Sequence, residues 1–356
     1  MKLTRPVVAT VLTVAAITLA GCAANDAALQ SSSSAPSVPA NAPGLEKAYI
    51  SVVHQVLPSV VQITSGNSLG SGIVFDTTGD IVTNAHVVGQ ASTFQVRLPN
   101  SPKTIPATLV GTYKPDDLAV IKLDQPPASL HPARFGDSAR LQVGEIVLAM
   151  GNPLGLTGSV TSGIISATGR TVTEPAESGP GATLPNVIQT SAAVNPGNSG
   201  GALVDLAGEV IGVPTLAALE PQTSILGSSS AAPGIGFAIP SNLVTDIAGQ
   251  LITHHGHVVN SHRAELGVQV VTVLDVNGQS SGVGVLRVEP GQPAAAAGIQ
   301  AGEVITAINN TPVLDTSGLA QELAKLDPGQ TVRVTLSTPQ GSTRTVTVTL
   351  GQLAGS

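Results

Sequence analysis

The most informative segment of the sequence is Ala193-Val194-Asn195-Pro196-Gly197-Asn198-Ser199-Gly200-Gly201. Its three glycines have no Cβ, so the backbone can turn sharply and approach another molecule closely. Pro196 has no N–H, so backbone donors in this loop come from Gly197 onward. Such a loop can aim two N–H groups at one point beside the Ser199 hydroxyl, as acyl transfer requires for a developing oxyanion. The alternative is a glycine-rich turn that carries a surface serine.

Two further segments offer the partners that a nucleophilic serine needs. A serine hydroxyl is a weak nucleophile until a base removes its proton, and the base needs a carboxylate that fixes its tautomer. His86 follows the strand-like run 80–83, and Asp117 precedes the apolar run 118–123. The order His86, Asp117, Ser199 is that of the chymotrypsin triad. The sequence lacks the strand–helix elbow motif, which disfavours a serine esterase as an alternative.

Composition and hydropathy patterning predict a β-rich protein of two or three domains. The chain has 356 residues with 39 Gly, 26 Pro and no Trp, and its short Val, Thr and Ile runs alternate with turns. This pattern is typical of barrels or sandwiches. We expect a helix over 45–56, two series of strands over 60–123 and 145–239, and long loops over 171–185 and 217–233. The net charge of −7, without a basic cluster, excludes nucleic acid as an expected partner.

The N-terminus has the features of a secretory signal. A short basic segment precedes apolar residues 7–19, and Leu19-Ala20-Gly21-Cys22 follows, an ending that resembles the bacterial lipobox. We therefore expect a signal peptide over 1–21, lipidation of Cys22, and a flexible tether over 22–44. The protein would then be anchored on the extracytoplasmic face of the cell membrane. The alternatives are an ordinary cleaved signal and an anchor helix, for which the apolar run is short.

Five motifs in this order resemble the HtrA family of trypsin-like serine proteases. The motifs are Thr83-Asn84-Ala85-His86-Val87-Val88, Asp117-Leu118-Ala119-Val120-Ile121-Lys122-Leu123, Gly151-Asn152-Pro153-Leu154-Gly155-Leu156, Val160-Thr161-Ser162-Gly163-Ile164-Ile165-Ser166 and Asn195-Pro196-Gly197-Asn198-Ser199-Gly200-Gly201. The resemblance covers about residues 45–352. It implies a mostly β fold, with a chymotrypsin-like double β-barrel protease domain over 45–250. The two six-stranded barrels would be perpendicular, with a cleft between them.

The resemblance implies a role for each residue that matches the motifs. Ser199 would be the nucleophile, His86 the general base and then acid, and Asp117 the group that orients His86. The N–H groups of Gly197 and Ser199 would form the oxyanion hole. The family places the carboxylate directly before Leu-Ala-Val, which selects Asp117 over Asp116, so Asp116 is expected to be a solvated loop carboxylate.

The resemblance also has implications for specificity and assembly. Ile235, Gly236 and Phe237 would border an S1 pocket, where the lack of charge predicts a small or medium aliphatic P1 residue. Ser191 stands where family members usually carry Asp, and Asp80 where an aromatic residue usually precedes the strand, but neither change removes a catalytic atom. The family implies a homotrimer and no metal or organic cofactor.

The C-terminal part predicts a linker and a second domain. The linker, 251–263, contains four histidines without a carboxylate or thiolate among them, which favours a polar linker over a metal site. Residues 264–352 resemble an α+β PDZ domain, with a short helix over 293–298 and another over 318–326. Such domains bind a peptide C-terminus by adding it as a strand. The N–H groups of Glu265, Leu266 and Gly267 would receive its carboxylate. The alternative is a packing module without a ligand.

Together these features imply an exported serine endopeptidase. It would cleave misfolded or damaged envelope proteins through an acyl-enzyme and bind unfolded substrates and peptide C-termini. The alternative is a chaperone or scaffold that binds unfolded chains with little proteolysis. The two differ in whether an unfolded substrate such as casein is degraded and whether Ser199→Ala keeps full client protection.

Overall fold

A computed structural model describes residues 42–66, 68–99, 101–152, 158–173, 182–195, 197–219, 231–338 and 341–355. The expected signal peptide and Cys22 lie outside these residues. Helix α1 (Ala42–Val56) contains the predicted 45–56 helix and buries Val52 and Val56 on one face. None of the helices in the described part of the chain combines the length and apolarity needed to cross a membrane.

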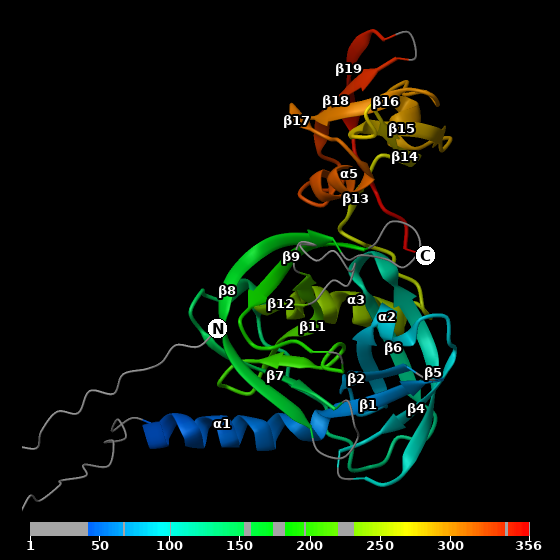
Figure 1. Cartoon of the computed structure of the whole chain (residues 1–356). Coiled ribbons are helices and arrows are strands. Elements are labelled where there is room, and N and C mark those ends of the chain that lie inside the picture. Colours follow the sequence, from blue (N-terminus) through cyan, green and yellow to red (C-terminus); the bar gives the residue numbers. More distant parts are fainter. Residues whose placement is uncertain are drawn as a thin grey trace, which may run out of the picture. The chain divides into compact units, whose positions relative to one another are not determined.

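The first barrel consists of six antiparallel strands that close in the order β1-β2-β3-β6-β5-β4 (Figure 1, blue to cyan). The strands are β1 (Val60–Ser65), β2 (Ser68–Val74), β3 (Asp80–Asn84), β4 (Thr93–Arg97), β5 (Thr104–Tyr113) and β6 (Leu118–Leu123). Their β-branched side chains favour extended backbone and fill an aliphatic core. Ile63, Ile81 and Ile121 are fully buried in it.

The second barrel repeats this plan and closes in the order β10-β11-β12-β9-β8-β7. The strands are β7 (Ile146–Gly151), β8 (Ser159–Thr173), β9 (Thr183–Thr190), β10 (Ala202–Val204), β11 (Val210–Leu219) and β12 (Ala231–Pro240). Helix α3 (Ser241–Thr253) follows and packs Ile247 and Leu251 into a core that both barrels share with it. The predicted mostly β, double-barrel fold is confirmed.

The two long loops are shorter than the sequence predicts. Strands β8 and β9 still pair at Thr173 and Thr183, and β11 and β12 still pair at Leu219 and Ala231. Strand pairing provides partners for the backbone groups of these polar and small residues, which composition alone does not reveal. The central parts of both loops lie outside the described residues.

The C-terminal region, considered by itself, is a small sheet with two helices. Strands β14 (Val268–Leu274), β15 (Ser280–Val288), β16 (Val304–Ile308), β18 (Thr331–Ser337) and β19 (Thr343–Thr349) pair in that order, and β17 (Thr311–Pro312) pairs with β16. Strands β13 (Ala264–Glu265) and β20 (Gly351–Gln352) form a separate pair. Helix α4 spans Pro293–Ala296. The sheet buries Val332, Val334 and Val348, with Val346 partly buried.

Helix α5 (Thr316–Leu323) begins earlier and ends earlier than the predicted 318–326 helix. Asp315 caps its start, because a side-chain oxygen accepts a hydrogen bond of 2.7 Å from Gly318 N. Beyond the helix, Leu326 N bonds to Leu323 O three residues back, a tighter turn that leads to the following proline.

An ion pair in this region couples its stability to pH. Glu303 is buried, and its carboxylate accepts hydrogen bonds of 2.7 Å from Arg344 Nε and Nη2 and of 2.8 Å from Gln300 N. The Arg344 hydrogen bond lowers the pKa of Glu303 below its ordinary value. A lowered folded-state pKa stabilises the fold at neutral pH, and this contribution is lost as pH falls through that pKa.

We expect Glu303→Gln to lower the melting temperature at pH 7 by about 2–4 °C. The difference from the wild type should shrink as pH falls, because Glu303 then becomes neutral in the wild type as well. Calorimetry at pH 7 and at an acidic pH measures this difference in melting temperature. Glu289→Gln is the control, since Glu289 forms a more exposed and longer pair with Arg287, at 3.4 Å. Equal shifts for the two variants would contradict the prediction.

Candidate active site

His86 is held at the junction of β3 and the short helix α2 (Ala85–Val88). Its Nδ1 lies 2.8 Å from Asp117 Oδ2, and its backbone N donates to Asp117 Oδ1 at 2.9 Å. Asn84 Nδ2 and Ala85 N both donate to the backbone oxygen of Asp117 at 3.0 Å. The turn that carries the imidazole is therefore fixed to the turn that carries the carboxylate.

Asp117 follows the 3-10 turn η2 (Lys114–Asp116) in a left-handed backbone conformation, with φ of 51°. The residue is 2 % exposed, whereas the side chain of His86 is 43 % exposed. The carboxylate thus lies beneath an imidazole that solvent and substrate can reach. An acceptor at Nδ1 fixes the tautomer in which Nδ1 carries the proton and Nε2 is the basic nitrogen.

Thr215, on β11, joins Asp117 to the loop over 193–201 that carries Ser199, called the serine loop here. Thr215 was not identified from the sequence. Its Oγ1 donates to Asp117 Oδ2 at 2.6 Å, and its carbonyl oxygen accepts from Ser199 Oγ at 3.2 Å. Thr215 thus links Ser199 to the His86–Asp117 pair in one hydrogen-bonded group. No motif marks Thr215; its only signal is a strand position shortly after the serine.

The serine loop has the geometry that its glycines suggest. Gly197 and Gly200 adopt φ of 100° and 77°. Asn198 N donates to Asn195 O at 2.9 Å, Gly201 N to Asn198 O at 2.9 Å, and Gly200 N to the oxygen of Pro214 at 3.0 Å. Within the described residues, neither Gly197 N nor Ser199 N donates a hydrogen bond.

The predicted S1 segment runs along the chain that leads into the serine loop. Gly236 pairs with Thr190, and a Cβ on Gly236 would lie 2.5 Å from Val194 Cγ2. Glycine therefore allows the Val194 side chain to pack directly against this strand, where any Cβ would collide with it. Ile235 is 37 % exposed and Phe237 is partly buried.

The two departures from the family pattern have local partners. Ser191 Oγ accepts a hydrogen bond from Ile164 N at 3.0 Å, so it links the segment before the serine loop to β8. Asp80 is buried and pairs with Lys122 Nζ at 2.7 Å across β3 and β6. Each of the two side chains thus forms a hydrogen bond to a residue of a neighbouring strand, Ser191 to β8 and Asp80 to β6.

The expectation that Asp116 is a solvated loop carboxylate is wrong. Asp116 is 1 % exposed, and its Oδ1 accepts from Arg263 Nη1 at 2.7 Å. The same nitrogen lies 2.8 Å from Pro115 O and 2.7 Å from Thr183 O. Burial raises the pKa of Asp116, and Arg263 opposes that rise. Arg263, in the linker, thus pairs with the carboxylate of Asp116, which does not face His86.

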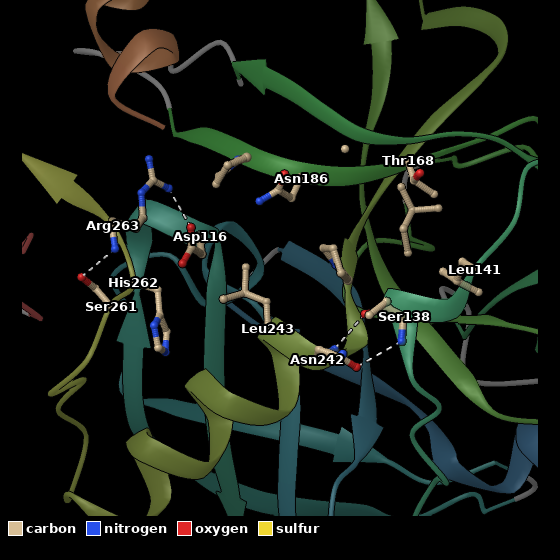
Figure 2. Close-up of a pocket in the computed structure, with 15 residues that line it drawn as sticks. Asp116, Ser138, Leu141, Thr168, Asn186, Asn242, Leu243, Ser261, His262 and Arg263 are labelled. Carbon is tan, nitrogen blue, oxygen red and sulfur yellow. Dashed lines mark hydrogen bonds and ion pairs between the residues drawn. The ribbon is translucent and has the colours of Figure 1, made fainter. Parts of the chain in front are cut away.

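A cavity of about 450 Å³ lies beside the Asp116–Arg263 pair and not at the His86–Asp117–Ser199 group. Figure 2 shows Arg263 next to Asp116 and, elsewhere on the lining, Asn242 hydrogen-bonded to Ser138. Among the linker histidines, His262 Nε2 lies 3.2 Å from Asp246 Oδ2. In the described part of the chain, no group of three or more His, Cys, Asp or Glu residues could hold a metal ion.

Glu265, Leu266 and Gly267, which are predicted to receive a peptide carboxylate, are held in place at both ends of their segment. Glu265 pairs with Gly351, and the oxygens of Leu266 and Gly267 accept hydrogen bonds from Ala294 N at 2.9 Å and Glu289 N at 3.0 Å. Gly267 adopts φ of 73°. Burial raises the pKa of Glu265.

Comparisons with known proteins place this geometry in a family. Residues 70–213 match the trypsin-like peptidase domain, and residues 264–350 match the PDZ domain. The serine protease PepD of Mycobacterium tuberculosis is 37 % identical over 335 residues, which cover 90 % of this chain and 69 % of PepD. A solved structure titled HtrA-type protease AlgW with decapeptide is 31 % identical, with a TM-score of 0.56, and the match covers 86 % of this chain and 98 % of AlgW. The chain belongs to the HtrA family.

Other HtrA relatives agree with this assignment. The periplasmic serine endoprotease DegP of Escherichia coli is 40 % identical over 270 residues, which cover 74 % of this chain and 52 % of DegP. This HtrA chain spans about half the length of DegP. The predicted family, trypsin-like peptidase domain and PDZ domain are confirmed.

Proposed function

We propose that this HtrA protein is an exported serine endopeptidase in which Ser199, His86 and Asp117 form the catalytic triad. The main support is the hydrogen-bonded group described above, in which Thr215 contacts both Ser199 Oγ and Asp117 Oδ2 and Asp117 contacts His86 Nδ1. The names of PepD and DegP, a serine protease and a serine endoprotease, support the same activity.

The proposed reaction assigns one step to each group. His86 Nε2 takes the Ser199 proton as Oγ attacks the substrate carbonyl, and Asp117 stabilises the imidazolium that forms. The oxygen that becomes negative is received by the N–H groups of Gly197 and Ser199. His86 then gives its proton to the leaving amine, which leaves an acyl-enzyme on Ser199. A water molecule, activated by His86, hydrolyses that ester.

We propose that a peptide C-terminus binds beside β14, which lies at the end of its sheet and pairs with β15 alone among the described strands. An added peptide strand would hydrogen-bond to β14, and Glu265, Leu266 and Gly267 would offer N–H groups to its carboxylate. Thr272 Oγ1 accepts from Thr316 N at 3.2 Å, which brings α5 beside this strand as the second wall. Calorimetric titration should show that a peptide with a free carboxylate binds and its C-terminal amide does not.

The remaining proposals concern location, assembly and domain limits. DegP is named periplasmic, which supports an extracytoplasmic location. We propose a signal peptide over 1–21, lipidation of Cys22 and a tether over 22–44, which mass spectrometry of the mature N-terminus would test. The protease domain would span 45–250, the linker 251–263 and the PDZ domain 264–352. A homotrimer, testable by sedimentation, would degrade misfolded or damaged envelope proteins.

The activity is tested with a fluorophosphonate probe and unfolded casein. The wild type should be labelled, with the label on Ser199 in tryptic peptides, and should degrade casein. Ser199→Ala should do neither while it melts at the wild-type temperature. Absence of both labelling and casein cleavage in the wild type would reject the peptidase and leave the scaffold alternative.

A further inference from the structure

Ser71, on β2 of the first barrel, contacts the serine loop of the second barrel through both its backbone and its side chain. The residue is fully buried. Its backbone N donates to Ser199 O at 3.0 Å. Its Oγ donates to Gly197 O at 2.5 Å and accepts from Asn152 N at 2.8 Å. The hydroxyl therefore donates a hydrogen bond to the serine loop and accepts one from the residue that follows β7.

The Gly197–Asn198 peptide is consequently held at both ends. Its N–H, on Asn198, bonds to Asn195 O, and its carbonyl bonds to the Ser71 hydroxyl. Gly151 closes the other side, since a Cβ there would lie 2.9 Å from Gly197 O. Gly197 itself has no side chain and a φ of 100°, so only such contacts limit rotation about its backbone bonds.

We propose that Ser71 is a positioning residue for the oxyanion hole. Its hydroxyl fixes the Gly197 carbonyl, and this limits the rotation of the glycine whose N–H receives the developing oxyanion. The inference rests on the proposed function, because it assumes that Gly197 N–H is one of the two oxyanion donors. Ser71 does not touch the substrate; it acts through Gly197 and takes no part in proton transfer.

A residue that only supports the fold and a residue that positions the oxyanion hole predict different effects of Ser71→Ala on kcat and KM. Ser71→Ala retains the hydrogen bond from Ser71 N to Ser199 O, so Ser199 keeps its position. The hydrogen bond that is lost is the one to Gly197 O. Removal of an oxyanion donor itself costs about 100- to 1000-fold in kcat. A donor that is loosened and not removed should cost less, about 10- to 100-fold in kcat, with little change in KM.

The experiment compares Ser71→Ala with Thr83→Val as a matched control. Thr83 is equally buried, and its Oγ1 donates to Ser71 O at 2.7 Å and not to Gly197 O. The readouts are kcat and KM on a peptide substrate, and the affinity for a peptide boronate ending in valine, whose Ser199 adduct places an oxygen in the oxyanion hole. The affinity for the corresponding peptide amide, which forms no adduct, gives the reference.

Ser71→Ala should lower kcat and boronate affinity by the same factor, about 10- to 100-fold, and leave amide affinity and KM unchanged. Ser71→Cys, which retains size and a weaker donor, should lie between wild type and Ser71→Ala and covers the case in which the alanine variant fails to fold. A loss no greater than that of Thr83→Val, or a loss confined to KM, would overturn the inference. Failure of the proposed function is distinguishable, because the wild type itself would then form no adduct at Ser199.

Discussion

Replacement of Asp117 by asparagine is expected to lower kcat on an unfolded substrate by about 10⁴-fold. The carboxylate accepts from His86 Nδ1, His86 N and Thr215 Oγ1. An amide of the same shape has one oxygen fewer and can turn its NH2 toward Nδ1. The imidazole then carries its proton on Nε2 and is no longer a base for Ser199. Steady-state kinetics measure the effect, and KM should change little.

Asp116→Asn is the matched control, since it makes the same chemical change one residue earlier. Asp116 faces Arg263 and not His86, so kcat should stay close to the wild-type value when both variants are measured below their melting temperatures. Loss of activity in Asp116→Asn equal to that in Asp117→Asn would mean that the wrong carboxylate has been assigned to His86.

The sequence was sufficient to predict that His86 and Asp117 lie together, because each lies in a local motif with a defined place relative to a strand. His86 follows β3, Asp117 precedes β6, and these two strands pair with Asn84 opposite Leu118. Strand adjacency therefore brings the two turns together. Val332 and Val334 alternate with polar residues along β18, and this period of two marks the buried face of the strand in the same local way.

The residues that sequence reasoning missed act through contacts between distant segments. Arg263 lies 147 positions from Asp116, and Ser71 lies 126 positions from Gly197. The adjacent carboxylates of Asp116 and Asp117 take different partners because Asp117 adopts a left-handed conformation, which turns the chain between them. Neither a pairing across the molecule nor a single unusual φ leaves a periodic signal in the sequence.

Replacement of Gly200 by alanine is expected to lower kcat/KM by at least about 100-fold, because it displaces the nucleophile. A Cβ at this position would lie 2.2 Å from Ser71 O and 2.4 Å from Thr83 Oγ1. The carbonyl of Ser71 belongs to β2, whose amide at the same residue binds Ser199 O, so the clash cannot relax without separating the serine from the first barrel. The φ of 77° adds backbone strain. Kinetics and fluorophosphonate labelling measure the loss.

Gly169→Ala is the control that separates the effect of backbone strain from that of a steric clash. Gly169 has a similar φ of 70°, but no atom lies within 4 Å of a Cβ built there. It should lose stability through strain, by about 1 kcal/mol, and retain its activity. If Gly200→Ala loses no more activity than Gly169→Ala, the close contact with β2 does not hold the nucleophile. A loss of activity in Gly200→Ala beyond what the similar backbone strain costs in Gly169→Ala would support the placement of Ser199 by the first barrel as well as by its own loop.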